Sequence, residues 1–499
     1  MNFYKILEII EYSKIINKPK NDFIVKDIFK DSREVTPGSL FCAMGDDILD
    51  GHQFINHALE KGALVILAEK AIASIPKNIP VILVKDSTTV FAKLSCHYFG
   101  YPADELNIIG VTGTNGKTTS TYILEEILKG WNKSPGVIGT VNYRFNNQIL
   151  VAENTTPHAN HYQRLLRLMK NNGVTHVISE ISSHGIALKR VSNLNLDTAI
   201  FTNLTLDHLD FHKDFEDYYQ TKKRLFTELL KNSTKKEKYA IINIDDEYGK
   251  RLHGELQAFS PVYFKLFSIS ISNKKADFYT KNLSISLDSS DFTLCHDKTE
   301  IKFSSPLIGH HNVMNLLGSI STALLYKMPQ TKIVSAIKKL TVVPGRLDKI
   351  TSKKGRHIFV DYAHSPDALE NVLTALGKLC KKRIFTVFGC GGDRDKSKRP
   401  LMGAIAEKLS SKIIITSDNP RTEKPDKIIS DIVVGLKDKN KYCVEPDRRT
   451  AIKRALLEAA PGDVILIAGK GHEDYQIIGT KKTHFSDKET VKEILDEIE

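Results

Sequence analysis

The sequence has few of the features that mark secreted or membrane proteins. It holds six cysteines in 499 residues, and none of them forms a C-x-x-C pair or a regular spacing. Scattered cysteines argue against a disulfide framework and indicate reduced thiols. No apolar run reaches the roughly 20 residues of a membrane span. Residues 1–20 alternate apolar side chains with Lys and Glu, so they lack a signal-peptide core. We therefore expect a cytoplasmic protein with no membrane insertion.

Signatures of nucleic-acid binding are also missing. The net charge of +12 would suit nucleic acid or acidic small molecules, but lysine is spread along the whole chain. No helix-turn-helix, zinc-finger or RRM pattern accompanies the charge, so we expect no nucleic-acid partner. Hydrophobic residues make up 41% and charged residues 26%, as in ordinary globular proteins. The length suits about three domains.

Short apolar runs alternate with amphipathic stretches, a pattern typical of α/β folds with mainly parallel sheets. The polar, alternating stretch 268–303 predicts antiparallel hairpins instead, and Val343–Arg346 resembles a linker. The predicted strands are 63–68, 81–84, 106–109, 176–180, 198–201, 239–243, 357–361, 384–389, 412–416 and 463–468.

A glycine-rich turn lies between the predicted strand at 106–109 and a helix-like stretch at 122–128. Glycines let backbone N–H groups approach phosphate oxygens, the lysine adds a positive charge, and the hydroxyl after it can bind Mg²⁺. Val111 stands where the usual P-loop has its first glycine, and a purely structural turn is the alternative. The strand and helix context favours nucleotide binding by Gly113, Thr114, Asn115, Gly116, Lys117, Thr118 and Thr119.

Carboxylate and imidazole side chains follow the next predicted strands. Glu180 ends an apolar run, and ligands bind at this edge of open α/β sheets, so it is a candidate Mg²⁺ ligand. The alternative is a glutamate that caps a loop. His208 lies in a loop rich in Asp and His, but no paired His or Cys spacing supports zinc. We favour His208 as a second Mg²⁺ ligand over local loop hydrogen bonding.

Further polar loops follow the strands of the last third of the chain, at 361–366, 389–395, 417–421 and 469–473. Each alone could be a turn, but four loops at one edge of a parallel sheet indicate a binding face. By contrast, Lys222 and Lys223 lie on a basic helical stretch, and the residues alone favour a solvated surface for them.

These motifs together resemble the ATP-dependent Mur ligases of peptidoglycan synthesis, over essentially the whole chain. Residues 112–118 are similar to that family's own P-loop variant. The resemblance implies three α/β domains: a smaller N-terminal domain, 1–104, that binds UDP-MurNAc; a central P-loop ATPase domain, 105–341, with a mostly parallel sheet; and a Rossmann-like amino-acid-binding domain, 342–499.

The resemblance also implies roles for individual residues. Four residues match catalytic positions: Lys117, Glu180, His208 and Lys222. Lys222 matches the lysine that relatives carry as a carbamate, so the resemblance places Lys222 in the active site and not on a solvated surface. Thr118, Glu180 and His208 match Mg²⁺ ligands. Asn312 and Arg346 match an ATP-contacting region. The muramoyl-dipeptide substrate is implied to contact Ser32, Asn154, Thr155, Thr156, Ser182 and Arg190.

The implied reaction adds an amino acid to UDP-MurNAc-L-Ala-D-Glu through an acyl phosphate formed with ATP. Residues 418–421 resemble the motif of members that add meso-diaminopimelate, whose distal carboxylate suits an arginine. The implied amino-acid contacts are Arg394, Asp418, Asn419, Pro420, Arg421, Gly469 and Glu473. The alternatives are a lysine-adding ligase, a folylpolyglutamate synthetase-like ligase and a nucleotide-binding regulator without catalysis. We expect a monomer.

Overall fold

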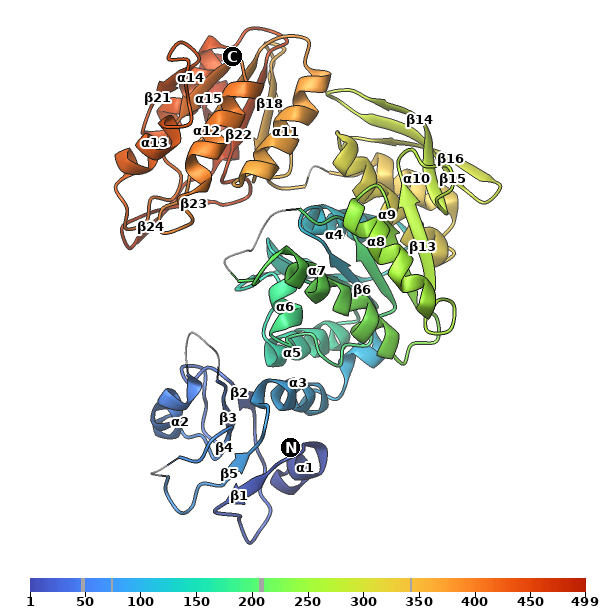
Figure 1. The fold of residues 1–499 in the computed structure, drawn as a ribbon, viewed down its shortest axis with the longest axis vertical. Helices are drawn as coiled ribbons and strands as arrows, with labels where there is room; N and C mark the ends of the chain where they lie inside the picture. Colours follow the sequence, from blue (N-terminus) through green and yellow to red (C-terminus); the bar gives the residue numbers. More distant parts are fainter. Residues whose placement is uncertain (46–49, 73–74, 206–210, 342) are drawn as a thin grey trace. The chain divides into compact units, whose positions relative to one another are not determined.

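The computed structural model describes residues 1–45, 50–72, 75–205, 211–341 and 343–499. By its internal contacts the chain divides into two compact units, Met1–Ile269 and Ser270–Glu499. Each unit consists of sheets covered by helices, so the predicted α/β class is confirmed (Figure 1). The finer division into domains at residues 104/105 and 341/342 stays a prediction.

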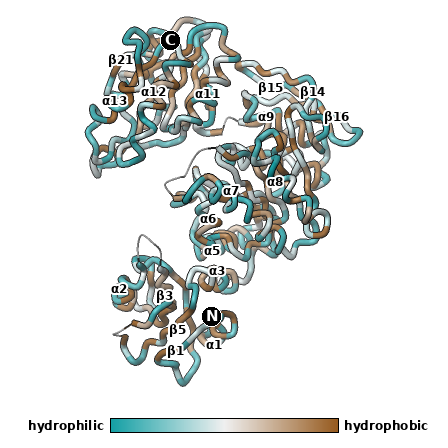
Figure 2. The backbone as a smooth tube through the Cα atoms, viewed as in Figure 1, coloured by the Kyte–Doolittle hydropathy of each residue, from teal (hydrophilic) through white to brown (hydrophobic). Residues whose placement is uncertain are grey.

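The first unit begins with a five-stranded sheet in the order β1-β5-β4-β3-β2, in which only β1 is antiparallel to its neighbour. Strands β4 and β5 confirm the two strands predicted there. The hydrophobic run of β5 is brown in Figure 2, and every residue of the two strands except the half-buried Leu83 is buried. The elements are α1 (Phe3–Ile9), β1 (Lys14–Ile16), β2 (Ile28–Phe29), β3 (Leu40–Ala43), α2 (Ile55–Glu60), β4 (Val65–Ala68), β5 (Val81–Leu83) and α3 (Ser87–Tyr98).

A larger sheet completes this unit. Strands β12, β11, β6, β10 and β7 run parallel to one another in that order, and β8 and β9 add an antiparallel edge. The elements are β6 (Asn107–Thr112), α4 (Lys117–Gly130), β7 (Pro135–Ile138), β8 (Asn142–Phe145), β9 (Gln148–Val151), α5 (Ala159–Asn171), β10 (His176–Glu180), α6 (Ser183–Ala187), β11 (Thr198–Phe201), α7 (Phe215–Arg224), β12 (Tyr239–Asn243), α8 (Glu247–Leu256) and β13 (Lys265–Ser270).

Strand β6 is longer than predicted. The prediction ended it at Ile109, but it continues through Gly110 and Val111 to Thr112. Gly110 lies beside the Ile181 side chain, and a Cβ at this position would approach Ile181 Cδ1 to 2.7 Å. The glycine therefore serves close packing within a central strand, and the turn begins only at Gly113.

The second unit opens with three antiparallel strands, as predicted for the polar stretch, although the residues up to Ser270 belong to β13, which is parallel to β12. A six-stranded sheet follows in the order β17-β18-β22-β19-β20-β21, parallel except for β17. The strands are β14 (Phe278–Ile285), β15 (Ser290–His296), β16 (Thr299–Ser305), β17 (Asp348–Thr351), β18 (His357–Asp361), β19 (Ile384–Phe388), β20 (Lys412–Ile415), β21 (Tyr442–Val444), β22 (Val464–Ala468), β23 (Tyr475–Ile478) and β24 (Lys481–His484).

Helices α11 and α12 contact each other, as do α14 and α15. Apolar side chains of β18, β19, β20 and β22 fill both faces of the sheet, which explains why these strands read as continuous hydrophobic runs. The helices are α9 (His310–Leu325), α10 (Gln330–Lys338), α11 (Pro366–Leu379), α12 (Lys398–Leu409), α13 (Pro425–Val433), α14 (Arg448–Glu458) and α15 (Asp487–Ile498). Among the described residues, no helix has the length and apolar composition needed to cross a membrane.

Candidate active site

The glycine-rich turn joins β6 to α4 with its glycines in conformations that other residues rarely adopt. Gly113 has φ +146° and Gly116, at the N-cap of α4, has φ +89°. A Cβ at Gly113 would lie 1.9 Å from Thr202 Oγ1, so a larger residue does not fit. Lys117 donates from Nζ to the carbonyl oxygens of Gly113 and Thr114, at 2.8 Å each. The turn thus brings its ammonium group to the N-terminus of a helix, where anions bind.

The loop after β11 braces this turn through a set of hydrogen bonds that the sequence did not predict. Thr114 N donates to the carbonyl of Asn203 at 2.9 Å, and Asn115 N donates to Asn203 Oδ1 at 2.9 Å. The Thr202 hydroxyl donates to the carbonyl of Asn115 at 2.6 Å. These hydrogen bonds fix the conformation of the turn from outside, and they use the N–H groups of Thr114 and Asn115.

Glu180 ends β10 with its carboxylate buried against two threonines. Thr118 Oγ1 donates to Glu180 Oε2 at 3.1 Å, and Thr140 donates from N to Oε1 at 3.0 Å and from Oγ1 to Oε2 at 2.9 Å. Gly139 packs against the same carboxylate, because a Cβ there would lie 2.4 Å from Oε1. Hydroxyl and carboxylate oxygens are hard ligands, so Thr118 and Glu180 fit Mg²⁺ chemically.

The residues predicted to contact the muramoyl-dipeptide lie next to Glu180. Thr156 Oγ1 donates to the carbonyl of Glu180 at 2.9 Å and lies 3.1 Å from Ser182 Oγ. Arg190 donates from Nη1 to the carbonyl of Thr156 at 2.9 Å. Its Nε is buried with no hydrogen-bond partner among the described residues, as expected of a group that binds a ligand.

Of the other members of this set, Thr155 and Asn154 connect to the same region and Ser32 does not. Thr155 Oγ1 lies 3.0 Å from Thr140 Oγ1, and the carbonyl of Asn154 accepts from Tyr143 OH at 2.7 Å. Ser32, in the turn between β2 and β3, has its Oγ 2.9 Å from His57 Nδ1. Its contacts do not join it to the Glu180 cluster directly.

Lys222 on α7 is buried, with 1% of its surface exposed, so the prediction of a solvated surface made from the residues alone was wrong. Its Nζ donates to the carbonyl of Gly113 at 3.0 Å and lies 4.6 Å from the centre of the Tyr218 ring. Lys223 instead forms an ion pair with Glu255 at 2.7 Å. Of the two adjacent lysines, Lys222 is therefore the one beside the P-loop. His208 lies outside the described residues.

In the second unit, the four predicted loops follow β18, β19, β20 and β22, which run parallel, so all four leave the same edge of the sheet. Arg421 has φ +51° and donates from Nη1 to the carbonyl of Gly392 at 2.8 Å. Arg394 and Arg421 both lie within 4 Å of the Cβ position of Gly391. Arg421 contributes its guanidinium group there and Arg394 its aliphatic stem, so two arginines from different loops lie at the same glycine.

The neighbouring loops are joined through Asn419. Its Nδ2 donates to Glu473 Oε2 at 2.8 Å, and its Oδ1 accepts from Lys470 Nζ at 3.1 Å and from Ile477 N at 3.0 Å. Burial and the nearby Asp418 raise the pKa of Glu473, and burial lowers the pKa of Lys470. Gly469, with φ +115°, lies so near Asp418 that a Cβ there would be 2.6 Å from Oδ2. Pro420 links Asn419 to Arg421 in the same loop.

The hairpin β23–β24 holds the 418–421 loop by its backbone. Arg421 N donates to the carbonyl of Ile477 at 3.0 Å, and Gly479 N donates to the carbonyl of Arg421 at 2.7 Å. Gln476 adds a side-chain hydrogen bond from Nε2 to the carbonyl of Asp418 at 2.7 Å. The conformation of Arg421 is therefore imposed by its neighbours.

The predicted ATP-contacting residues of this unit, Asn312 and Arg346, each contact a neighbouring part of the chain. Asn312, near the start of α9, donates from Nδ2 to the carbonyl of Ile308 at 2.9 Å. The Arg346 guanidinium lies 5.0 Å from the centre of the Tyr362 ring. Asp361, at the end of β18, accepts from the N–H groups of Leu347 and Ala363 at 2.6 and 2.8 Å. Burial raises the pKa of Asp361, against the effect of Arg346.

Comparison with known proteins agrees with this arrangement. Residues 111–323 match the Mur ligase middle domain, and residues 345–471 match the Mur ligase, glutamate ligase domain. A UDP-N-acetylmuramoyl-L-alanyl-D-glutamate--2,6-diaminopimelate ligase of Aquifex aeolicus is 43% identical over 94% of each chain. A ligase of the same name from Clostridium tetani is 40% identical over 100% of each chain. The chain belongs to the Mur ligase family.

A solved structure supports the fold of this Mur ligase. It is titled a UDP-N-acetylmuramoyl-L-alanyl-D-glutamate--2,6-diaminopimelate ligase, is 33% identical, covers 95% of both chains and superposes with a TM-score of 0.69. The predicted fold class and family resemblance are therefore confirmed. The roles of individual site residues stay predictions.

Sequence reasoning missed several polar residues of this Mur ligase that the fold brings to the same places. Thr140 contacts Glu180, and Thr202 and Asn203 brace the P-loop. Lys470 donates a hydrogen bond from Nζ to Asn419 Oδ1. Thr202, Asn203 and Lys470 had a signal, since each follows a predicted strand; Thr140 follows a short strand that the pattern did not reveal.

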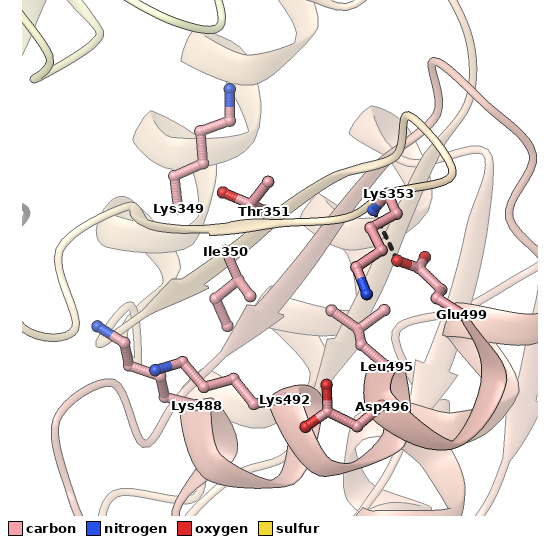
Figure 3. Close-up of a pocket in the computed structure, with 9 residues that line it drawn as sticks. All are labelled: Lys349, Ile350, Thr351, Lys353, Lys488, Lys492, Leu495, Asp496 and Glu499. Carbon is pink, nitrogen blue, oxygen red and sulfur yellow. Dashed lines mark hydrogen bonds between the residues drawn. The ribbon is translucent and has the colours of Figure 1, made fainter.

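A pocket of about 420 Å³ lies between β17 and α15, and none of the predicted site residues lines it (Figure 3). Along β17, Ile350 points toward α15, whereas Lys349 and Thr351 lie on the other side of the strand. Two of its lysines are already paired, Lys488 with Asp348 at 2.7 Å and Lys349 with Asp288. We assign no role in the reaction of this Mur ligase to this pocket.

Proposed function

We propose that the chain is an ATP-dependent, ADP-forming amide ligase that adds meso-2,6-diaminopimelate to UDP-N-acetylmuramoyl-L-alanyl-D-glutamate in cytoplasmic peptidoglycan precursor synthesis. The observation that carries the proposal is the position of Arg421, which the carbonyl of Gly392 and the β23–β24 hairpin hold at the edge of the second unit's sheet. The names of the relatives from Aquifex aeolicus and Clostridium tetani support the same reaction. We further propose that the enzyme acts as a monomer without nucleic-acid or membrane partners.

In the first step, ATP phosphorylates the D-glutamate side-chain carboxylate and gives an acyl phosphate and ADP. Lys117, at the N-terminus of α4, neutralises charge on the transferring phosphoryl group, and the N-terminus of this helix favours the same anion. Mg²⁺, held by Thr118, Glu180 and His208, would supply further charge neutralisation. Lys222, as its carbamate, would add a carboxylate-like ligand beside the same phosphate.

In the second step, the amino group of the incoming amino acid attacks the acyl carbon, forms the amide and expels phosphate. No protein nucleophile is required, so catalysis rests on positioning and on charge stabilisation. Ser32, Asn154, Thr155, Thr156, Ser182 and Arg190 would hold the muramoyl-dipeptide, and Asn312 and Arg346 would contact ATP.

Specificity follows from the charges of the amino-acid site. The distal centre of meso-diaminopimelate carries a carboxylate, which the guanidinium groups of Arg421 and Arg394 can bind, and an ammonium, which Glu473 can accept. Lysine offers only an ammonium there, so Arg421 would lose its partner and repel the substrate. This argument favours a meso-diaminopimelate ligase over a lysine-adding one.

The test is a competition in which meso-diaminopimelate and lysine are supplied together and the product mass is measured. We expect the mass of the meso-diaminopimelate product, and we expect Arg421→Ala to lose kcat/KM for meso-diaminopimelate by roughly 100-fold or more, the scale of a charged hydrogen-bonded pair. A lysine product, or an unchanged kcat/KM in the variant, would overturn the assignment. Nucleotide binding with no amide formed would favour a regulatory protein.

A further inference from the structure

Arg448, the first residue of α14, forms a fully buried ion pair with Asp487, the first residue of α15. Both side chains are 0% exposed. Arg448 donates from Nε to Asp487 Oδ1 and from Nη2 to Asp487 Oδ2, at 2.7 Å each. This two-point geometry fixes the plane of the guanidinium group.

The same guanidinium group contacts the backbone where two loops of the amino-acid site begin. Nη1 donates to the carbonyl of Ser417 at 3.3 Å, and Nη2 donates to the carbonyl of Ala468 at 2.9 Å. Ser417 directly precedes the 418–421 loop, and Ala468 directly precedes the 469–473 loop. One side chain therefore links the two loops at the residues that precede them.

We propose that Arg448, oriented by Asp487, is a positioning residue that fixes the distance between the 418–421 and 469–473 loops and so tunes selection of meso-diaminopimelate. This inference rests on the proposed function, because it assumes that these loops bind the amino acid. Arg421 comes from the first loop and Glu473 from the second. A change in their separation weakens simultaneous contact with the carboxylate and the ammonium of one substrate.

The shape of the guanidinium group, rather than its charge alone, makes this bridge. It presents its donors in a planar fork, so it holds two carboxylate oxygens and two carbonyl oxygens at once. A lysine ammonium in the same place has three donors around one nitrogen and cannot reach all four acceptors. Arg448→Lys thus keeps the charge that Asp487 needs and loses the bridge.

A matched control exists in the same unit. Arg356 is also buried and paired, with Glu499, and it donates to the carbonyl of Leu456 and to Ser352 Oγ. None of these partners belongs to the predicted site. Arg356→Lys therefore reports the general cost of replacing a buried arginine, without moving the two loops.

The test compares steady-state kinetics of the wild type, Arg448→Lys and Arg356→Lys in an assay of ATP-dependent phosphate release. We expect Arg448→Lys to raise KM for meso-diaminopimelate at least about tenfold, which corresponds to about 1.4 kcal/mol, with KM for ATP and for the UDP-linked substrate unchanged. Its preference for meso-diaminopimelate over lysine should fall. Arg356→Lys should keep all three KM values.

A second variant guards against misfolding of the first. In Arg448→Met/Asp487→Leu both charges are removed together, and such replacement of a buried ion pair is often neutral or stabilising. Because the bridge is also lost, the same rise in KM for meso-diaminopimelate is expected. An unchanged KM and unchanged preference in either folded variant overturns the inference. If the wild type itself does not use meso-diaminopimelate, it is the proposed function that fails.

Discussion

Substitution of Gly139 by alanine tests whether the position of the Glu180 carboxylate controls the reaction. The φ of Gly139 lies outside the left-handed region, so the backbone itself accepts alanine. The new Cβ would lie 2.4 Å from Glu180 Oε1, where ordinary contact begins at 3.4 Å, so the carboxylate must move by about 1 Å. Its hydrogen bonds with Thr118 and Thr140 are 2.9 to 3.1 Å long, and a shift of this size breaks them.

A misplacement of about 1 Å at a reacting centre costs on the order of 100-fold in rate, or about 2.7 kcal/mol. We therefore expect Gly139→Ala to lose about 100-fold in kcat and to need more Mg²⁺ for half-maximal activity. The assay is phosphate release at saturating substrates over a Mg²⁺ titration. The melting temperature, measured alongside, separates this effect from unfolding.

The matched control is Gly254→Ala. Gly254 lies within α8, and a Cβ there would meet nothing within 4 Å. Alanine is a better helix former by about 1 kcal/mol, so this variant should be as active as the wild type and slightly more stable. If Gly139→Ala keeps kcat within about twofold of the wild type, with the same Mg²⁺ requirement, the position of the Glu180 carboxylate does not control the reaction.

Two further predictions concern Lys222 and His176. If Lys222 is the carbamylated residue, isotope-labelled bicarbonate should give a carbamate signal in the NMR spectrum that persists in Lys223→Met and disappears in Lys222→Met; a signal that follows Lys223 would reverse the assignment. Burial lowers the pKa of His176 from 6.5 to about 4. The unfolded chain therefore takes up the proton first, and stability that is complete above about pH 6.5 is lost as the pH falls toward 4, by up to about 2 kcal/mol at pH 5. Denaturant titrations at pH 7.5 and 5 should show a smaller loss for His176→Gln, and an equal loss in both proteins would contradict this.

The hydrophobic strands were predictable because parallel strands buried on both faces are continuous apolar runs, as at Ile384–Phe388 and Val464–Ala468. Their order along the chain also placed the polar loops at one edge. The boundary of β6 was missed, because a glycine chosen for packing against Ile181 looks like the glycine of a turn.

Other contacts depended on tertiary packing. The helix that carries Lys222, α7, is rich in polar and charged residues, as surface helices are. The Lys222 side chain is nevertheless buried, against the Tyr218 ring and the carbonyl of Gly113. Arg448 reaches the carbonyl oxygens of Ser417 and Ala468, which are 31 and 20 positions away in sequence. Every residue has a backbone carbonyl, so no sequence motif can show which carbonyl oxygens a distant side chain will contact.

The β23–β24 hairpin fixes the conformation of Arg421 through main-chain hydrogen bonds, so this conformation does not depend on which side chains the hairpin carries. The residues of β24 are exposed, and the hydrogen bonds to Arg421 use only main-chain atoms of Ile477 and Gly479. Mutations can therefore accumulate on the hairpin's outer face while the arginine keeps its direction. An insertion or deletion between Ile477 and Gly479 would instead shift the main-chain partners of Arg421. To change the direction of the Arg421 side chain, and with it the amino acid that is selected, protein engineering should therefore alter the length of the hairpin rather than its composition.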